Sequence, residues 1–170
     1  MFNEVFLDDL FVPDDCVVGE VNGGWKLART TLANERVAMG SSKLGVSTER
    51  AVGLIAGRES ETDAALVGHQ VALATLCQLL GVRSTLRSIA GRGPGPESSV
   101  AKLLGVKNRQ EAAELVVDLL GPSALFTTDD AQIAKDVHEM LLNRCLSIAG
   151  GTTQILRNVV AERVLGLPRS

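Results

Sequence analysis

Apolar residues recur at three- and four-residue spacing over most of the chain, the period of helices that bury one face. This spacing predicts a first helix from Gly23 to Gly57 and a second over residues 65–90. The break GRGPGPESS follows, because Pro94 and Pro96 cannot continue a helix. Leucines form the expected buried face of the second helix: Leu66, Leu73, Leu76, Leu80 and Leu86.

Three further helices are expected after this break. One begins at a cap on Ser98 or Ser99 and stops at Gly121-Pro122. The next begins near Asp129, whose carboxylate suits a helix N-terminus. The last covers residues 153–165. Four long helices joined by short breaks predict an antiparallel four-helix bundle, here with an extra short C-terminal helix.

Residues 1–22 show a different pattern. Two short apolar runs, Val5-Phe6-Leu7 and Leu10-Phe11-Val12, flank Asp8-Asp9 and predict two short strands. Such a pair is too small to be stable alone, so it is expected to be a remnant of a larger sheet. The predicted fold class is therefore mainly α. Residues 1–22 are assigned to a β-domain remnant and residues 23–170 to the helical bundle.

Composition narrows the range of partners. The 17 basic and 20 acidic residues are interspersed and give a net charge of −3, so no nucleic-acid partner is expected. The three cysteines and two histidines are scattered, and we expect no metal site. No leader-like segment or uninterrupted membrane-length apolar run is visible, which favours a cytoplasmic protein without a membrane partner. Helices this poor in charge favour oligomerisation, although a large monomer core would give the same pattern.

The run IAGGTTQILR, from Ile148 to Arg157, is the candidate site. Two consecutive glycines allow the backbone to approach a ligand closely, but alone they more often mark a tight turn between helices. Followed by RNVVAERVLGLP, the run resembles the C-terminal signature of the acyl-CoA dehydrogenase family. Gly150 lies where many members carry the catalytic glutamate. The N-terminal run FNEVFLDDLFVPDDCVVGEVNGGW resembles the end of that family's middle β-domain, which implies the C-terminal part of a longer protein.

The resemblance implies α,β-dehydrogenation of an acyl-CoA thioester with FAD as cofactor and electron-transfer flavoprotein as electron acceptor. It also implies a homo- or hetero-oligomer, either a dimer or a tetramer. Glu35 is the candidate base, because Glu35-Arg36 in NERVAMG resembles the pair of the isovaleryl-CoA dehydrogenase type. A Glu-Arg pair without this resemblance would more often lie on a solvated helix face. Thr152 and Gln154 are implied as hydrogen-bonding residues near the flavin.

Two alternatives stay open: a non-catalytic subunit of a hetero-oligomeric acyl-CoA dehydrogenase, and a helical oligomerisation module. Two observations motivate the first alternative. The usual glutamate is missing, and the motifs that contact the adenine side of the flavin in this family match weakly here, with Arg58 and Gly121 as the residues that still match. The segment alone is expected to be inactive. Three side chains outside the motifs are interpreted as structural, with Trp25 and Cys145 in the core and Lys102 on a helix surface.

Overall fold

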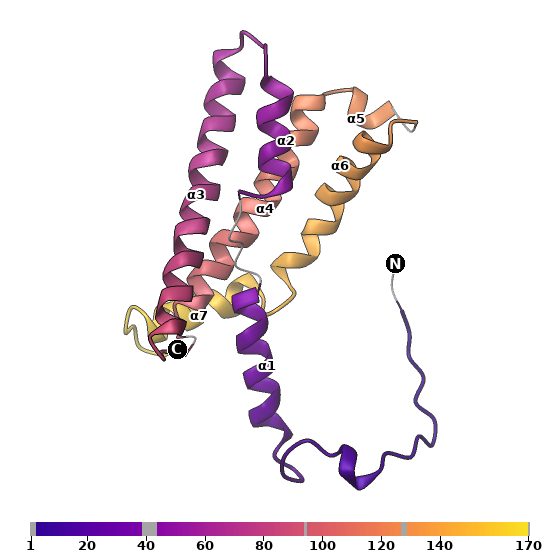
Figure 1. The fold of residues 1–170 in the computed structure, drawn as a ribbon, viewed down its shortest axis with the longest axis vertical. Coiled ribbons are helices and arrows are strands. Elements are labelled where there is room, and N and C mark those ends of the chain that lie inside the picture. Colours follow the sequence, from indigo (N-terminus) through magenta and orange to yellow (C-terminus); the bar gives the residue numbers. More distant parts are fainter. Residues whose placement is uncertain (1–2, 39–43, 94, 127–128, 170) are drawn as a thin grey trace.

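The computed structural model describes residues 3–38, 44–93, 95–126 and 129–169, with side chains described for all of these except 32–38. Within these ranges the regular structure is helical, and no strand occurs (Figure 1). The α-helices are α1 (Gly24–Ala38), α2 (Val46–Ile55), α3 (Glu61–Ile89), α4 (Ser98–Leu120), α5 (Ser123–Phe126), α6 (Ala131–Leu142) and α7 (Thr153–Arg163). Two short 3-10 helices are η1 (Asp14–Cys16) and η2 (Asn143–Ser147).

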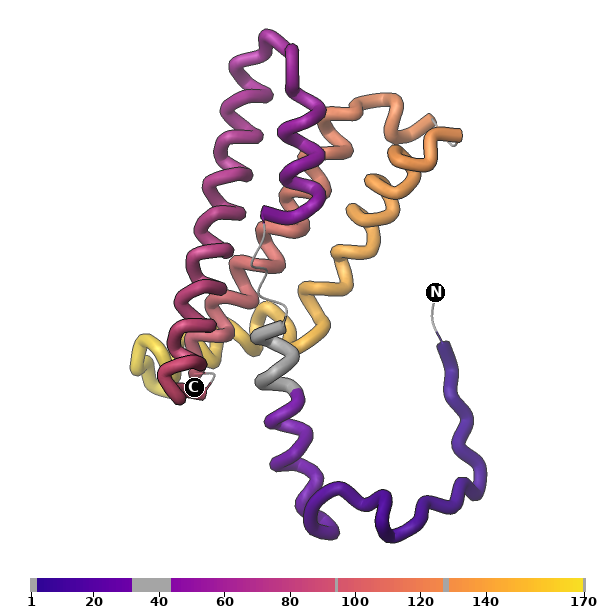
Figure 2. The backbone as a smooth tube through the Cα atoms, viewed as in Figure 1, coloured from indigo at the N-terminus to yellow at the C-terminus, as the bar shows by residue number. Residues whose placement is uncertain are grey.

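Helix α4 is the centre of the bundle. It contacts each of the six other α-helices in the described part of the chain. Helices α2, α3, α4 and α6 alternate in direction, which confirms the predicted antiparallel four-helix bundle, and α7 lies at the end where α4 begins (Figures 1 and 2). Small and polar side chains make up the buried stripe of α4, so its neighbours approach closely: Ser99, Lys102, Gly105, Asn108, Ala112, Ala113 and Val116.

The apolar core lies where α2, α3 and α4 meet. Ala51, Val67 and Val116, one from each helix, form its buried centre. Partly buried hydrophobic side chains surround them: Leu54, Ile55, Val71, Leu115, Leu119 and Leu120. At the same end, the guanidinium of Arg58 donates to the carbonyl of Leu119, at 3.2 and 3.3 Å. Arg58 therefore joins the α2–α3 connection to the C-terminus of α4.

Most helix ends follow the sequence signals. Gly121, at a φ of 59°, ends α4 as expected. Asp130 caps α6, accepting from the backbone N–H groups of residues 132 and 133, one position after the expected Asp129. The predicted cap on Ser98 or Ser99 is wrong, because Glu97 precedes α4 and makes no side-chain cap.

The single helix predicted from Gly23 to Gly57 is also wrong. Helices α1 and α2 replace it, with residues 39–43 outside the described part of the chain. Gly45 immediately precedes α2 with a φ of 99°, which is incompatible with a continuous α-helix. The prediction joined Met39 to Leu44 as one apolar face and gave no weight to Gly40, Ser41 and Ser42 between them or to Gly45 after them.

The predicted buried face of α3 is shifted. Leu66, Leu76 and Leu86 are exposed, whereas the buried positions are Val67, Gln70, Ala74 and Cys77. A polar contact fixes this register: Gln70 Nε2 donates to Asn108 of α4, at 2.7 Å to Oδ1 and 3.1 Å to the carbonyl. By length and composition alone α3 could also cross a membrane, a criterion that helices of soluble bundles meet too.

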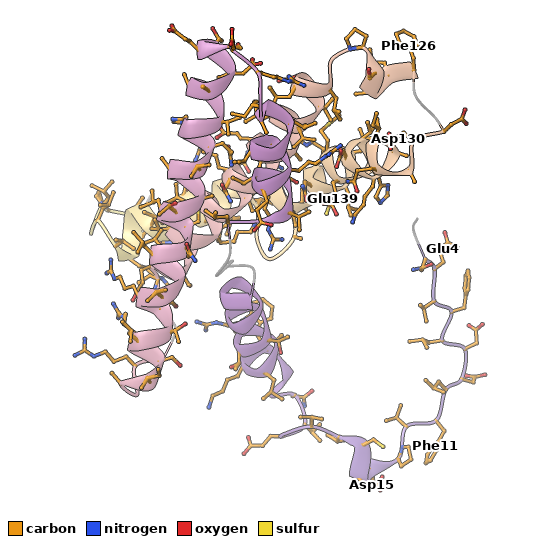
Figure 3. All side chains as sticks on the ribbon, turned by 45° about the horizontal axis from the view of Figure 1, so that its top comes forward. Glu4, Phe11, Asp15, Phe126, Asp130 and Glu139 are labelled. Carbon is orange, nitrogen blue, oxygen red and sulfur yellow. The ribbon has the colours of Figure 1, made fainter. Side chains whose placement is uncertain are left out.

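The two strands expected between Val5 and Val12 are absent from the described residues. The chain there is extended and exposed, it runs apart from the bundle, and η1 is its single helical turn (Figures 1 and 3). A strand needs a partner for its backbone groups, and no other part of the described ranges forms one with this segment. Trp25 at the start of α1 is 74% exposed, so its predicted core role is wrong. Assignment of residues 1–22 to a β-domain stays a prediction.

Candidate functional site

The glycine-rich loop joins η2 to α7. Gly150 and Gly151 have φ values of 65° and 109°, which strongly favour glycine. Thr152 then caps α7, because its Oγ1 accepts a hydrogen bond from the Ile155 N–H at 3.3 Å. The Gly-Gly-Thr sequence therefore builds a sharp change of direction that ends on an open helix N-terminus.

Two fully buried side chains hold this loop against α4. Lys102 is 1% exposed, and its Nζ donates to the carbonyl of Gly151 at 2.6 Å. Leu156 is 0% exposed and lies so close that a Cβ added at Gly151 would be 3.4 Å from its Cδ2. The prediction of Lys102 as a surface cation is therefore wrong. Lysine is seldom buried, and hydrophobic periodicity does not mark it. One feature of the sequence could have indicated that Lys102 is buried. Lys102 lies three residues from both Ser99 and Gly105, on the same face of α4, and these small residues leave space for its side chain.

The segment before the loop is also tied to α4. Gln110 Nε2 donates to the carbonyl of Asn143 at 2.9 Å, and Asn143 Nδ2 donates to the carbonyl of Arg109 at 3.4 Å. Arg144 pairs with Glu114 at 2.6 Å. The loop is thus supported on both sides by one rigid helix. Cys145, in the same segment, is exposed and is not the core residue expected.

On its open side the loop offers hydrogen-bond donors. No acceptor occurs in the described part of the chain for the backbone N–H groups of Thr152, Thr153 and Gln154. The Gln154 side chain is exposed, whereas Thr152 is half-buried. Unpaired N–H groups at a helix N-terminus attract anionic or electron-rich groups. Close by, a groove of about 500 Å³ runs between α4 and the first turn of α7, with Leu103, Lys107, Gln110, Thr153 and Arg157 among its lining residues.

The structure brings two of the three predicted site residues together. Thr152 and Gln154 lie at the cap and second residue of α7. The backbone of Glu35 belongs to α1, which contacts α4, but its side chain lies outside the described side chains. The role of Glu35 as a base therefore stays a prediction, as do the flavin contacts of Thr152 and Gln154.

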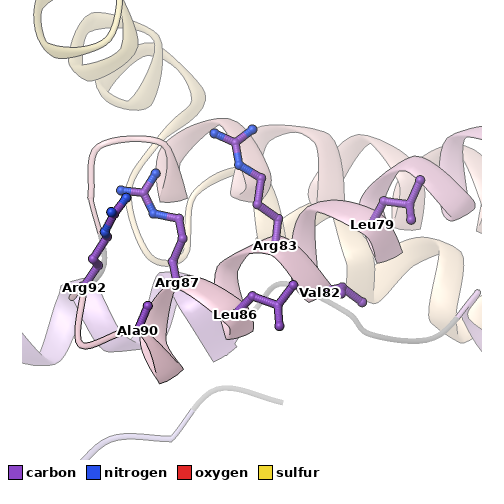
Figure 4. A pocket seen from close by; sticks show the side chains of 7 residues that line it. All are labelled: Leu79, Val82, Arg83, Leu86, Arg87, Ala90 and Arg92. Atoms are coloured by element: carbon purple, nitrogen blue, oxygen red, sulfur yellow. The ribbon is translucent and has the colours of Figure 1, made fainter.

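A second groove, of about 460 Å³, lies at the C-terminal end of α3. Leucine, valine and arginine side chains line it: Leu79, Val82, Arg83, Leu86, Arg87 and Arg92 (Figure 4). Arg87 is paired with Glu97 at 2.7 Å. Across the described ranges, no group of three or more His, Cys, Asp or Glu residues could hold a metal ion.

Relatives of known family share this organisation. Acyl-CoA dehydrogenase FadE34 of Mycobacterium tuberculosis is 46% identical over 99% of the chain, which spans 23% of that relative. Acyl-CoA dehydrogenase IpdE1 of the same organism is 36% identical over 99% of the chain and 44% of its own length. Among solved structures, a Tcur3481-Tcur3483 steroid ACAD variant superposes with a TM-score of 0.75 at 25% identity, over 94% of this chain and 44% of that one.

The chain thus spans between 23% and 44% of the length of these relatives. The family model described as "Acyl-CoA dehydrogenase, C-terminal domain" matches residues 22–165, which include all seven α-helices and the Gly150–Gly151 loop. The chain therefore belongs to the acyl-CoA dehydrogenase family and corresponds to its C-terminal helical domain.

Proposed function

We propose that this chain is the C-terminal domain of a flavin-dependent acyl-CoA dehydrogenase that converts an acyl-CoA thioester to its α,β-unsaturated form. The observation that carries the proposal is the family match over residues 22–165, with the glycine-rich loop standing on α4 at the signature position. We propose that the remaining parts of the active site lie in the further length that these relatives have beyond the matched region.

The loop is suited to hold FAD. Its glycines carry no side chain that would keep a planar ring away from the backbone, and the N–H groups at the start of α7 have no acceptor in the described part of the chain. The Thr152 hydroxyl already accepts one bond but can still donate, and the exposed Gln154 amide can donate as well. When bound, FAD supplies the two-electron oxidation, and these residues bind and orient it.

The α-proton of the substrate requires a base. Gly150 has no side chain and cannot take the proton, so a carboxylate must come from another element. Glu35 on α1 is the proposed base, on the resemblance of Glu35-Arg36 to the pair of the isovaleryl-CoA dehydrogenase type. Arg36 stays protonated at any physiological pH, so it would stabilise negative charge and would not take protons.

The small residues Ala149 and Gly150 support a bulky acyl chain as substrate. Where many family members place a tyrosine and a glutamate, this chain has two small residues, which removes side-chain volume at these positions. We propose a branched or ring-bearing acyl group, and the similarity to a steroid ACAD supports the ring-bearing class.

The proposed assembly is a homo- or hetero-oligomer in the cytoplasm, a dimer or tetramer that passes electrons to electron-transfer flavoprotein. An exposed apolar face along the C-terminal half of α3 supports association: Leu76, Leu79, Val82, Leu86 and Ile89.

A second candidate is a non-catalytic subunit whose partner supplies the base. The absence of a carboxylate at Gly150 favours it. In a non-catalytic subunit the loop would still contribute to a flavin site. A helical oligomerisation module would not require a flavin site.

The full-length protein separates these candidates. It is purified, its visible spectrum is recorded, and saturated acyl-CoAs with straight, branched and ring-bearing chains are added without oxygen. Our proposal requires bound flavin that is bleached most rapidly by a branched or ring-bearing substrate. Bound flavin that bleaches only with a second polypeptide favours the non-catalytic subunit. A protein that binds no flavin contradicts both.

A further inference from the structure

Lys102 is the largest fully buried side chain in the described part of the chain. Burial of an ammonium group is costly unless it is well hydrogen-bonded, and an apolar side chain of similar volume usually gives an equally stable core. A cation at this position therefore depends on its hydrogen-bond acceptors. Its 2.6 Å bond to the carbonyl of Gly151 points to the loop as the reason.

The contact between Lys102 and the Gly151 carbonyl also determines the direction of an N–H group on the open side of the loop, because both belong to one peptide group. In a trans peptide the C=O and the following N–H point in opposite directions, and no cis peptide bond occurs in the described chain. Because Lys102 holds the Gly151 carbonyl towards α4, the Thr152 N–H is directed away from α4. This is the first of the donors at the start of α7 that have no acceptor in the described residues.

Without such an anchor, this peptide would turn easily. Gly150 and Gly151 are adjacent and both adopt positive φ, and glycine loses more backbone freedom on ordering than any other residue. Leu156 packs beneath the loop but makes no polar contact that could fix the direction of a carbonyl. Lys102 supplies the direction.

We propose that Lys102 is a positioning residue for the flavin-facing loop: its buried ammonium orients the Gly151–Thr152 peptide so that the donors of α7 face the cofactor. This inference rests on the proposed function, because the ligand is the FAD of that site. Because Lys102 is 1% exposed, it is proposed to act through the loop peptide and not by direct contact with FAD.

The test compares Lys102→Met with Gln70→Met in the full-length protein. Gln70 is also buried and also hydrogen-bonds to α4, but its partner is Asn108 and not the loop. Three quantities are measured: the Kd for FAD, the hydrogen exchange of residues 149–154, and the thermal unfolding midpoint. Loss of a charge-assisted hydrogen bond should raise the FAD Kd of Lys102→Met about 10- to 100-fold. Exchange at 149–154 should rise with it. Gln70→Met should lower the unfolding midpoint and leave both other quantities unchanged.

Three results would overturn the inference: wild-type FAD affinity in Lys102→Met, unchanged exchange at 149–154, or equal loss of affinity in Gln70→Met. Should Lys102→Met fail to fold, Lys102→Gln replaces it, since its amide stops one bond short of the carbonyl, and the same criteria apply. If the wild type binds no FAD, the proposed function fails, and exchange at 149–154 alone decides whether Lys102 orders the loop.

Discussion

Truncation of Leu156 tests the support beneath the loop. Leu156 is fully buried, so Leu156→Ala removes three carbons from the interior, worth about 0.8 kcal/mol each, or roughly 2.4 kcal/mol in transfer free energy. The cavity adds a further term, which places buried Leu→Ala changes at about 2–5 kcal/mol. Gly150 and Gly151 lie above the site and can relax into the space, so the expected loss is about 3 kcal/mol.

Urea unfolding of the 170-residue chain, followed by helical circular dichroism, measures this loss. The matched control is Ile155→Ala, one position earlier on α7 and 56% exposed, which should cost about 1 kcal/mol or less. A loss of 3 kcal/mol in a chain of this size corresponds to a fall in Tm of roughly 6–12 °C. If Leu156→Ala and Ile155→Ala cost the same, or if Leu156→Ala costs under about 1 kcal/mol, the loop is not anchored on Leu156 as described.

Three further predictions concern groups outside the loop. Asp136→Asn weakens the 3.1 Å ion pair with Arg50 that joins α6 to α2, and should lower the unfolding free energy by about 1–3 kcal/mol; an unchanged urea midpoint contradicts this. Burial raises the pKa of the Cys77 thiol, so alkylation followed by mass spectrometry should show Cys77 reacting more slowly than exposed Cys145. The stability that Cys77 gains as a neutral thiol is present below its unfolded pKa and is lost as the pH rises through the raised value. Trp25, the single tryptophan, is exposed, so acrylamide should quench its fluorescence nearly as fully as in the unfolded chain, and strong shielding would contradict the position of α1.

The bundle could be predicted because residues with strong backbone preferences lie at several of its helix ends. Gly91 and Gly121, with φ values of 73° and 59°, follow the ends of α3 and α4, and Pro96 lies just before α4. One such signal was overlooked. The prediction ran a single helix from Gly23 to Gly57 through Gly40, Ser41, Ser42 and Gly45, and Gly45 precedes α2 with a φ of 99°.

The buried faces could not be predicted from hydrophobicity, because the central helix is not hydrophobic there. Helix α4 presents Ser99, Gly105 and Asn108 to its neighbours, so α3 turns Gln70 inward and leaves several leucines outside. Lys102 was missed for the same reason. One of its contacts is with the backbone carbonyl of Gly151, 49 positions away, and no local pattern encodes such a contact.

The candidate site was found through its motif, while its support required the structure. The positive φ values of Gly150 and Gly151 explain why glycine occupies both positions, while the close approach of a ligand to this backbone stays a prediction. Thr152 serves as the cap of α7, a role that the sequence Gly-Thr-Thr allowed but did not require.

The most direct test of the account is flavin reduction in the full-length protein carrying Glu35→Gln. The substitution keeps size and hydrogen bonding but removes basicity, and loss of a positioned base costs about 10²- to 10⁴-fold in rate. Anaerobic stopped-flow measurement with a ring-bearing acyl-CoA should show flavin and substrate bound as in wild type, with reduction slowed by that factor. The control Glu49→Gln, at an exposed position of α2, should reduce its flavin at the wild-type rate. Reduction at the wild-type rate in Glu35→Gln would contradict the account, because another residue would then take the proton.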